Sequence, residues 1–179
     1  MLVCGVDIVE VSRIEAVLAR HGQRFLDRIY SPLEVAVSRD RAGELAARFA
    51  AKEAVSKALG VGIFGADGLS WRDVEVLPDR RGRPLVYLYG KAEHRASTLG
   101  LTEIAVSLSH DGGLAIALVV AQGPGDAEGL DPVAWRETLS AWVAAKQRVP
   151  PGGSGVDGGT LLEPVRDPTS GGAAAESWH

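Results

Sequence analysis

The sequence predicts an α+β fold in which an antiparallel sheet packs against one long helix and several shorter helices. Three observations support this prediction. Apolar residues recur at helical spacing through much of residues 11–59. Two apolar segments, residues 103–110 and 114–121, meet at Asp111-Gly112-Gly113, which is a hairpin signal. The chain also starts with a Val- and Ile-rich segment, residues 2–10, that is typical of a strand and that we expect to join the later sheet.

Helices are predicted where start and stop signals flank the helical spacing. One should begin near Val11, stop at Gly22 and be followed by a short helix over residues 23–29. Ser31-Pro32-Leu33-Glu34 matches a helix start, with a serine N-cap, a proline in the first turn and a glutamate three residues after the cap. The longest helix should run from about residue 42 to 59 and end before a glycine-rich loop. That loop contains Gly60, Gly62, Gly65 and Gly68.

The second half of the chain predicts strands separated by turns. Residues 70–77 and 84–89 should be strands joined by a turn at Asp79-Arg80-Arg81-Gly82. Residues 91–99 should form a helix that ends at Gly100.

The composition changes after Gln122, which divides the chain into a predicted domain and a tail. Residues 123–179 hold 10 of the 22 glycines and 6 of the 9 prolines, so we expect this tail to be largely disordered. One amphipathic helix is possible within it, at residues 132–147. Residues 1–122 form the predicted domain, which is long enough for a hydrophobic core of its own.

Charge and cysteine content exclude several classes of protein. Residues 1–122 hold 15 acidic and 15 basic residues, and this neutral body argues against general nucleic-acid binding. We expect no membrane span and no signal peptide. Cys4 is the single cysteine, so an intrachain disulfide is excluded; we expect it to be a small buried hydrophobe in a protein of the reducing cytoplasm.

Asp7, Glu53 and Lys57 are the leading candidates for chemistry. Asp7 interrupts an apolar strand, where it could cap the following helix or meet a second carboxylate at a hard cation. Glu53 and Lys57 lie one helical turn apart, so they could form an ordinary surface ion pair. In the functional interpretation, Glu53 binds a metal ion and Lys57 binds a phosphate oxygen.

Two further groups of polar residues have both a structural and a functional interpretation. Ser109 and His110 stand at the end of a predicted strand, where a histidine could be an ordinary surface residue or could donate to a phosphate. Four arginines would line one side of the first helices if these were roughly continuous. That basic stripe (Arg13, Arg20, Arg24 and Arg28) could be a solvated helix face or a docking surface for an acidic protein.

Three segments, in this order, resemble the holo-acyl-carrier-protein synthase family, the small 4′-phosphopantetheinyl transferases. The first is Gly-Val-Asp-Ile-Val-Glu-Val-Ser-Arg-Ile at residues 5–14, the second spans residues 48–60, and the third is Val-Ser-Leu-Ser-His at residues 106–110. Gly82-Arg83-Pro84 is similar to the Gly-x-Pro hairpin of that family. The resemblance covers about residues 1–122 and leaves the tail outside the family pattern.

The resemblance implies a 4′-phosphopantetheinyl transferase-like fold and a Mg²⁺-dependent reaction. Coenzyme A would donate its phosphopantetheine arm to a serine of an apo-acyl carrier protein, with release of adenosine 3′,5′-bisphosphate. Asp7 and Glu53 would be the protein ligands of Mg²⁺, Lys57 would stabilise charge on the pyrophosphate, and His110 would contact the nucleotide phosphates. The family implies contact with coenzyme A at Lys57, Gly60, Gly62, Gly82, Pro84, Ser109 and His110.

The resemblance also implies partners and an assembly. The helix that contains Arg13 would meet the acidic helix of the carrier protein. The chain would form a cytoplasmic homotrimer with sites at subunit interfaces, would act in fatty acid biosynthesis, and would bind neither nucleic acid nor membrane. The basic turn at Arg80, Arg81 and Arg83 is a further hypothesis for the 3′-phosphate of coenzyme A.

Two alternatives stay open at this point. A Mg²⁺-dependent nucleotide pyrophosphate hydrolase could use the same pair, Asp7 and Glu53, with water as the acceptor. A non-catalytic module that binds the carrier protein would need no metal pair.

Overall fold

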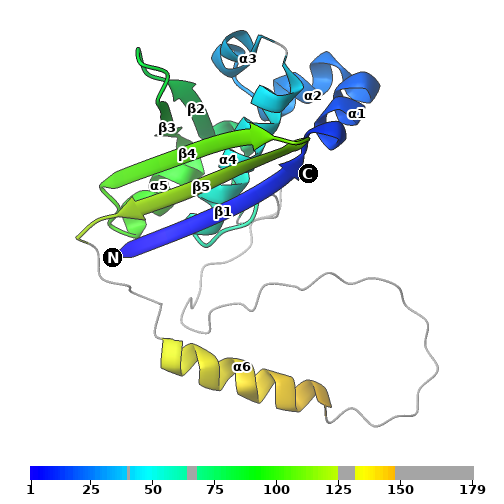
Figure 1. The fold of residues 1–179 in the computed structure, drawn as a ribbon. Helices are drawn as coiled ribbons and strands as arrows, with labels where there is room; N and C mark the ends of the chain where they lie inside the picture. Colours follow the sequence, from blue (N-terminus) through cyan, green and yellow to red (C-terminus); the bar gives the residue numbers. More distant parts are fainter. Residues whose placement is uncertain (40, 64–67, 125–131, 148–179) are drawn as a thin grey trace, which may run out of the picture. The chain divides into compact units, whose positions relative to one another are not determined.

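A computed structural model describes residues 1–39, 41–63, 68–124 and 132–147 of the chain (Figure 1). Most predicted elements are present, with ends that differ by one or two residues. In chain order they are β1 (Leu2–Glu10), α1 (Val11–His21), α2 (Gln23–Ile29), α3 (Pro32–Ser38), α4 (Ala42–Ala58), the 3-10 turn η1 (Trp71–Asp73), β2 (Val74–Pro78), β3 (Pro84–Leu88), α5 (Gly90–Thr98), β4 (Glu103–Asp111), β5 (Leu114–Gln122) and α6 (Pro132–Gln147).

The first strand and the predicted hairpin form one antiparallel sheet in the order β1-β5-β4. The register places Asp7 opposite Ala117, and Ala117 opposite Leu108. Gly112 and Gly113 make the two-residue turn between β4 and β5, with φ values of 56° and 81° that favour glycine. The hairpin and the joining of the first strand to it are therefore both confirmed.

β2 and β3 form a second, two-stranded antiparallel sheet and are not hydrogen-bonded to the first one. Our expectation of a single sheet is therefore wrong. The strand predicted from residue 70 begins at Val74, because Ser70 caps the 3-10 turn η1. The Ser70 hydroxyl accepts from the Arg72 N–H at 3.3 Å, and the Ser70 N–H donates to Asp73 Oδ2 at 2.8 Å. These local hydrogen bonds offer the backbone an alternative to a strand.

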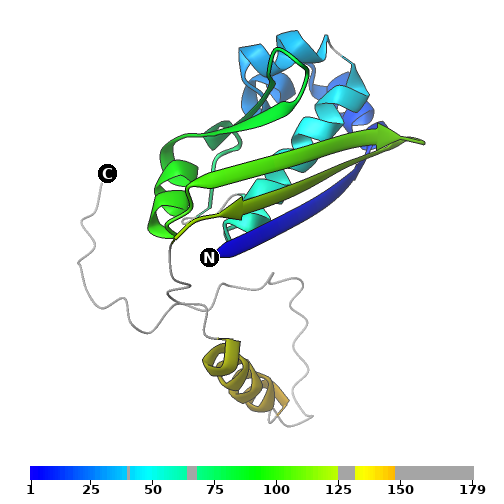
Figure 2. The same ribbon diagram turned by 60° about the vertical axis from the view of Figure 1, so that its left-hand side comes forward.

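α4 lies along one face of the three-stranded sheet, as the two views in Figures 1 and 2 show. Every second residue of β5 from Ala115 to Ala121 is buried on this face. Alanines on both elements allow the helix axis to approach the strands closely. The buried alanines of α4 are Ala46, Ala47, Ala50, Ala51, Ala54 and Ala58.

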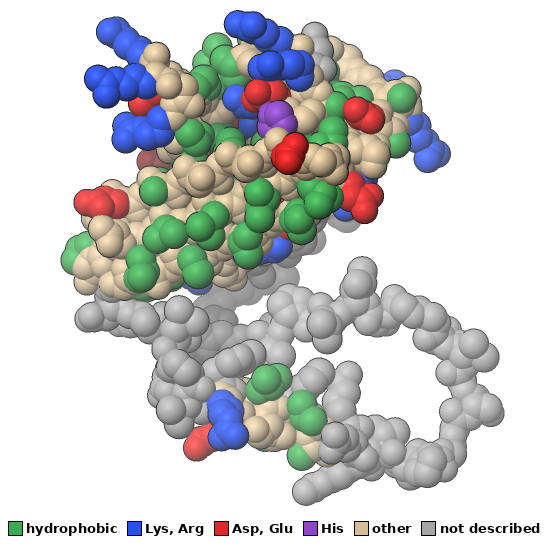
Figure 3. Space-filling model, in the orientation of Figure 1, with side chains coloured by type: hydrophobic (Ala, Val, Ile, Leu, Met, Phe, Trp, Pro, Cys, Tyr) green, Lys and Arg blue, Asp and Glu red, His purple; other side chains and the backbone are tan. Residues whose placement is uncertain are grey.

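The opposite face of this sheet, called here the outer sheet face, carries exposed apolar side chains (Figure 3). They come from alternate positions of β1 and β5: Leu2, Val6, Ile8, Leu114, Ile116, Leu118 and Val120. Cys4 lies between Leu2 and Val6 on the same face, because successive strand residues point to opposite faces. Cys4 is exposed, so our expectation of a buried cysteine is wrong.

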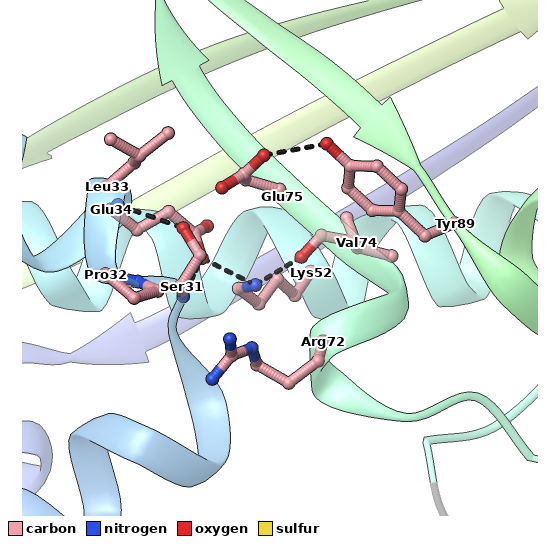
Figure 4. Close-up of a pocket in the computed structure, with 9 residues that line it drawn as sticks. All are labelled: Ser31, Pro32, Leu33, Glu34, Lys52, Arg72, Val74, Glu75 and Tyr89. Atoms are coloured by element: carbon pink, nitrogen blue, oxygen red, sulfur yellow. Dashed lines mark hydrogen bonds and ion pairs between the residues drawn. The ribbon is translucent and has the colours of Figure 1, made fainter.

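The capping box predicted at the start of α3 is confirmed, and its glutamate also binds a buried lysine (Figure 4). Ser31 Oγ accepts from the Glu34 N–H at 3.1 Å, and the Ser31 N–H donates to Glu34 Oε2 at 2.8 Å.

Lys52 of α4 pairs with Glu34 at 2.9 Å, and both side chains are fully buried. Lys52 also donates to the carbonyl oxygens of Trp71 and Val74. Burial lowers the pKa of Lys52, whereas Glu34 raises it. The Lys52–Glu34 pair thus links α4 to α3 and η1, and both residues line a pocket of about 320 Å³.

The chain divides into two compact units, Met1–Trp135 and Arg136–His179. Gly123 belongs to the first, since its N–H donates to the Met1 carbonyl at 3.1 Å and its carbonyl accepts from the Met1 amino group at 2.6 Å. The helix predicted at residues 132–147 is confirmed as α6, whereas the rest of the tail after Pro124, for which disorder is predicted, lies outside the described residues. The domain boundary at residue 122 stays a prediction. In the described part of the chain, no helix is both long and apolar enough to cross a membrane.

Candidate active site

β1 and α4 approach closely because glycine stands at position 5. A Cβ atom built on Gly5 would lie 2.0 Å from the Ala54 carbonyl oxygen and 2.8 Å from the Ala58 amide nitrogen. Both are backbone atoms of α4, which cannot move aside as a flexible side chain would. Asp7 stands two residues after Gly5 on the same, α4-facing side of β1. The Gly5 contact therefore brings the Asp7 carboxylate against the last turns of α4.

Asp7 pairs with Lys57 of α4. Lys57 Nζ lies 2.7 Å from Asp7 Oδ1 and 3.0 Å from the Val6 carbonyl oxygen. The Asp7 side chain is 17% exposed and the Lys57 side chain 51%, so the ion pair opens to solvent on the lysine side. Lys57 therefore binds a carboxylate from the neighbouring strand rather than Glu53, the partner that helical spacing suggested.

Glu53 lies beside this ion pair. Burial raises the pKa of Glu53, and the charge of the Asp7 carboxylate raises it further, whereas Lys57 and Arg13 lower it. The net shift of the Glu53 pKa is upward. The charge of Asp7 acts on Glu53 only if the two carboxylates lie in the same neighbourhood. The fold thus brings together the Asp7 cluster, which we define as Asp7, Glu53 and Lys57, and it places Arg13 at the margin of that cluster.

The donors of the Asp7 cluster suit a hard cation that arrives with a phosphate-bearing substrate. Within the described residues, no group of three or more His, Cys, Asp or Glu side chains could hold a metal ion. Mg²⁺, however, typically uses only one or two carboxylates, and phosphate and water oxygens complete its shell. A cation bound by Asp7 and Glu53 would also offset the Asp7 charge, which after burial is the second cause of the raised Glu53 pKa.

His110 lies near the start of α4, away from the Asp7 cluster. His110 Nε2 is 3.8 Å from Glu44 Oε1. Glu44 and Glu53 are nine residues apart on α4, which corresponds to about 14 Å along the helix axis. His110 and the Asp7 cluster thus lie at different ends of the same helix, on the two edge strands of the sheet.

Of the predicted glycine positions after α4 that the structure describes, Gly60 is the one that contacts the Asp7 cluster. Gly60 follows α4 with a φ of 67°, and its N–H donates to the Lys57 carbonyl at 3.1 Å. The Gly62 carbonyl accepts from the Leu69 N–H at 2.9 Å. Gly65, another glycine of this loop, lies outside the described residues.

Other predicted contacts of coenzyme A are not brought to the Asp7 cluster within one chain. Ser109 and His110 are consecutive on β4, so His110 faces α4 and Ser109 lies on the outer sheet face. Gly82, with a φ of 84°, and Pro84 lie at the turn between β2 and β3. No hydrogen bond or ion pair between described residues joins Ser109, Gly82 or Pro84 to the cluster.

The basic stripe is divided between two helices. Gly22, with a φ of 49°, separates α1 from α2, so Arg13 and Arg20 belong to α1 while Arg24 and Arg28 belong to α2. All four side chains are exposed. The roughly continuous helix on which a single stripe depended is therefore absent. Arg13 is the member whose charge reaches the Asp7 cluster.

Comparison with known proteins places this chain in a family. The profile of the 4′-phosphopantetheinyl transferase superfamily matches residues 3–119. A holo-acyl-carrier-protein synthase of Herpetosiphon aurantiacus is 50% identical over 127 residues, which cover 69% of this chain and all of that protein. One of Dehalococcoides mccartyi is 51% identical over 122 residues, which cover 68% of this chain and 99% of that protein. The chain belongs to the holo-acyl-carrier-protein synthase family.

Solved structures of holo-acyl-carrier-protein synthases share the fold. The Helicobacter pylori synthase in complex with coenzyme A has a TM-score of 0.60 and 37% identity, covering 66% of this chain and 99% of that one. The Chronobacterium ammoniagenes complex with coenzyme A has a TM-score of 0.61 and 34% identity, covering 69% of this chain and 98% of that one. The predicted 4′-phosphopantetheinyl transferase-like α+β fold is confirmed.

This member of the synthase family also has a charged network that the sequence interpretation missed. Arg48 is 6% exposed and donates to the Val76 carbonyl at 3.2 Å and to Glu44 Oε2 at 2.9 Å. Arg41 binds the other Glu44 oxygen at 3.0 Å. Burial raises the pKa of Glu44, but the hydrogen bond and charge of Arg48, together with Arg41 and His110, lower it overall. The i,i+4 spacing of Glu44 and Arg48 could have indicated their pairing, whereas nothing local indicated that His110 lies beside them.

Proposed function

We propose that the chain transfers the 4′-phosphopantetheine group of coenzyme A to a serine of an apo-acyl carrier protein, with release of adenosine 3′,5′-bisphosphate. The observation that carries this proposal is the convergence of Asp7, Glu53 and Lys57 on the scaffold of the synthase family. The coenzyme A complexes of the two solved relatives support coenzyme A as the donor. Such a transfer depends on positioning and charge neutralisation more than on a strong protein nucleophile.

Each member of the Asp7 cluster has a role in this proposal. Asp7 and Glu53 would hold Mg²⁺, which when bound neutralises charge on the coenzyme A pyrophosphate. Lys57 is half exposed, so its ammonium group can turn from Asp7 towards a pyrophosphate oxygen and donate a proton to the leaving phosphate. His110, farther along α4, would bind a phosphate of the nucleotide part of coenzyme A. Gly60 lacks a side chain next to Lys57, so a ligand can approach the backbone there.

A transfer assay that compares an intact carrier protein with a carrier lacking the acceptor serine tests this function. The full chain is incubated with coenzyme A, Mg²⁺ and an apo-acyl carrier protein, and the mass of the carrier is then measured by mass spectrometry. We expect the carrier to gain one phosphopantetheine group, and we expect no gain when its acceptor serine is replaced by alanine. Cleavage of coenzyme A without a gain in carrier mass would instead establish a hydrolase. Carrier binding with neither cleavage nor transfer would establish a binding module.

We further propose that the chain acts as a homotrimer with substrate sites at subunit boundaries, as the family resemblance implies. The apolar side chains of the outer sheet face are gathered on one exposed face, and such a patch usually marks an association site (Figure 3). Ser109 lies on that face, and Gly82 and Pro84 lie apart from the Asp7 cluster, so a second subunit would have to supply these contacts. A closed ring of identical subunits satisfies both requirements.

Replacing Leu118 by aspartate is expected to dissociate the assembly. Leu118 is 48% exposed at the centre of the outer sheet face, and a charge there would be desolvated in an interface. Analytical ultracentrifugation should give three times the 18.8 kDa chain mass for the wild type and the single-chain mass for the variant. Leu33→Asp, at an exposed position of α3, is the control that should stay assembled.

Cys4, the only thiol, provides a second measurement: it should react slowly with a thiol reagent in the wild type and rapidly in Leu118→Asp. A monomeric wild type with a fast-reacting Cys4 would contradict the proposal.

Replacing Arg13 by glutamate is expected to raise the Michaelis constant for the carrier protein by about tenfold with a smaller effect on kcat. Arg13 is exposed beside the Asp7 cluster, and carrier proteins are acidic, so charge reversal converts attraction into repulsion. The activity should also become less sensitive to salt, because fewer charge pairs remain to be screened. Arg136→Glu, an exposed residue of α6, is the control with the same change in net charge. An unchanged Michaelis constant for the carrier would remove Arg13 from the interface.

We also propose a cytoplasmic location and a role in fatty acid biosynthesis. The free thiol of Cys4, the single cysteine of the chain, suits a reducing compartment. The curated relatives are named for the modification of acyl carrier proteins, which supports a carrier of this class as the acceptor.

A further inference from the structure

The first turn of α4 holds the imidazole ring of His110 between two neighbouring residues. A Cβ atom built on Gly43 would lie 3.2 Å from His110 Nδ1 and 3.5 Å from both Cγ and Cε1. The ring therefore lies so close to the Gly43 Cα that a side chain at position 43 would force it to shift by a few tenths of an ångström. At the other edge of the ring, Glu44 Oε1 lies 3.8 Å from Nε2.

Gly43 is not required by the backbone of α4. It lies one residue after the first residue of the helix, and its φ is not positive, so an alanine could adopt the same conformation. Alanine favours a helix more than glycine does. The contact with the His110 ring is the feature of the structure that explains a glycine at this position.

The Glu44 carboxylate is itself fixed in place. Arg41 Nη2 binds Oε1 at 3.0 Å, and Arg48 Nη1 binds Oε2 at 2.9 Å and the Glu44 carbonyl oxygen at 3.1 Å. The buried Arg48 is anchored in turn to the Val76 carbonyl. Among the residues that the structure describes, no hydrogen bond anchors His110 in the same way, and its side chain is 48% exposed at the end of β4. Its orientation thus depends on contacts with α4.

We propose that Gly43 and Glu44 are positioning residues for His110. Glu44 attracts the Nε2 edge of the ring towards α4, and the absence of a side chain at Gly43 lets the ring lie directly against the helix. This inference rests on the proposed function, in which His110 binds a phosphate of coenzyme A. A side chain at position 43 would displace the ring from the position in which it binds that phosphate.

The proposal is tested first by substrate kinetics in a double-mutant cycle. Gly43→Ala should raise the Michaelis constant for coenzyme A about tenfold, the scale of one lost hydrogen bond to a charged group, while the Michaelis constant for the carrier stays unchanged. Its melting temperature should equal or exceed that of the wild type, which a structural defect would not produce. In a His110→Ala background, Gly43→Ala should have no further effect. Equal effects in the two backgrounds would overturn the proposal, as would a wild-type Michaelis constant in Gly43→Ala.

A second measurement needs no substrate and separates this inference from the proposed function. The imidazole signals of His110, assigned by their loss in His110→Ala, should shift in NMR spectra of both Gly43→Ala and Glu44→Gln. The signals of His21 on α1 and His94 on α5 are internal controls and should not shift. If the His110 signals shift but the wild type transfers nothing, the positioning stands and the proposed function fails. Unshifted His110 signals in both variants would overturn the positioning itself.

Discussion

Replacing Glu53 by glutamine is expected to reduce the rate of phosphopantetheine transfer by about 10²–10³-fold, the scale seen when one electrostatic contact with a transition state is removed. Glutamine keeps the shape of the side chain but removes one of the two charges that would hold Mg²⁺. The ion pair of Lys57 with Asp7 at 2.7 Å does not involve Glu53, so the local structure should persist. Rates measured across a Mg²⁺ titration check this expectation.

Glu10→Gln is a matched control for this variant. Glu10 is an exposed glutamate on β1, and its neutralisation should leave both the rate and the Mg²⁺ requirement unchanged. Full activity of Glu53→Gln at low Mg²⁺ would remove Glu53 from the metal site and with it the proposed role of the carboxylate pair.

The same variant should be slightly more stable than the wild type when no ligand is bound. Burial and then Asp7 raise the folded-state pKa of Glu53, so the folded chain binds this proton more tightly than the unfolded chain. Ionised Glu53 therefore destabilises the fold fully above its raised pKa, and the effect disappears as the pH falls below the ordinary glutamate value of about 4.3. Glu53→Gln should melt about 1–3 °C higher at pH 7.5 and at the wild-type temperature at pH 4. A lower melting temperature at pH 7.5 would contradict the assigned cause of the shift.

Replacing Gly5 by alanine is expected to destabilise the chain by about 3 kcal/mol, at the upper end of the cost of overpacking a core. The new Cβ would stand 2.0 Å from the Ala54 carbonyl oxygen, so β1 and α4 must separate. The melting temperature should fall by roughly 10 °C. Any protein that still folds should transfer poorly, because Asp7 moves away from Glu53 together with β1.

A second-site variant shows whether the backbone of α4 is the obstacle. Ala54→Gly removes a side chain but leaves the carbonyl oxygen where it is, so it should not rescue Gly5→Ala. The backbone conformation of Gly5 is open to alanine, and alanine would otherwise be favoured by its lower entropy in the unfolded chain. A Gly5→Ala protein as stable as the wild type would show that β1 can shift without cost, and the argument for close approach would then fail.

The sequence predicted the elements well where local signals are strong. Ser31 and Glu34 indicated the start of α3, and the Gly112-Gly113 turn indicated the β4–β5 hairpin, because caps and tight turns are determined by neighbouring residues. The start of β2 was missed, because the Ser70 and Asp73 side chains form a 3-10 turn in a segment of strand-like composition. The burial of Cys4 was also predicted wrongly. An apolar strand has two faces, and its composition does not tell which of them packs against a helix.

By itself, the sequence determined which groups are available for chemistry: Asp7, Glu53 and Lys57 stand in segments whose order and spacing match a known family. Only the tertiary structure decided which of them meet. Helical spacing placed Lys57 beside Glu53, yet Lys57 binds Asp7, because Gly5 allows β1 to lie directly on α4. Likewise, the alternation of β4 and its place beside α4 separate Ser109 from His110 and bring His110 to Gly43 and Glu44. Contacts between residues far apart in the chain depend on how closely backbones can approach, and that distance is set by packing rather than by local sequence.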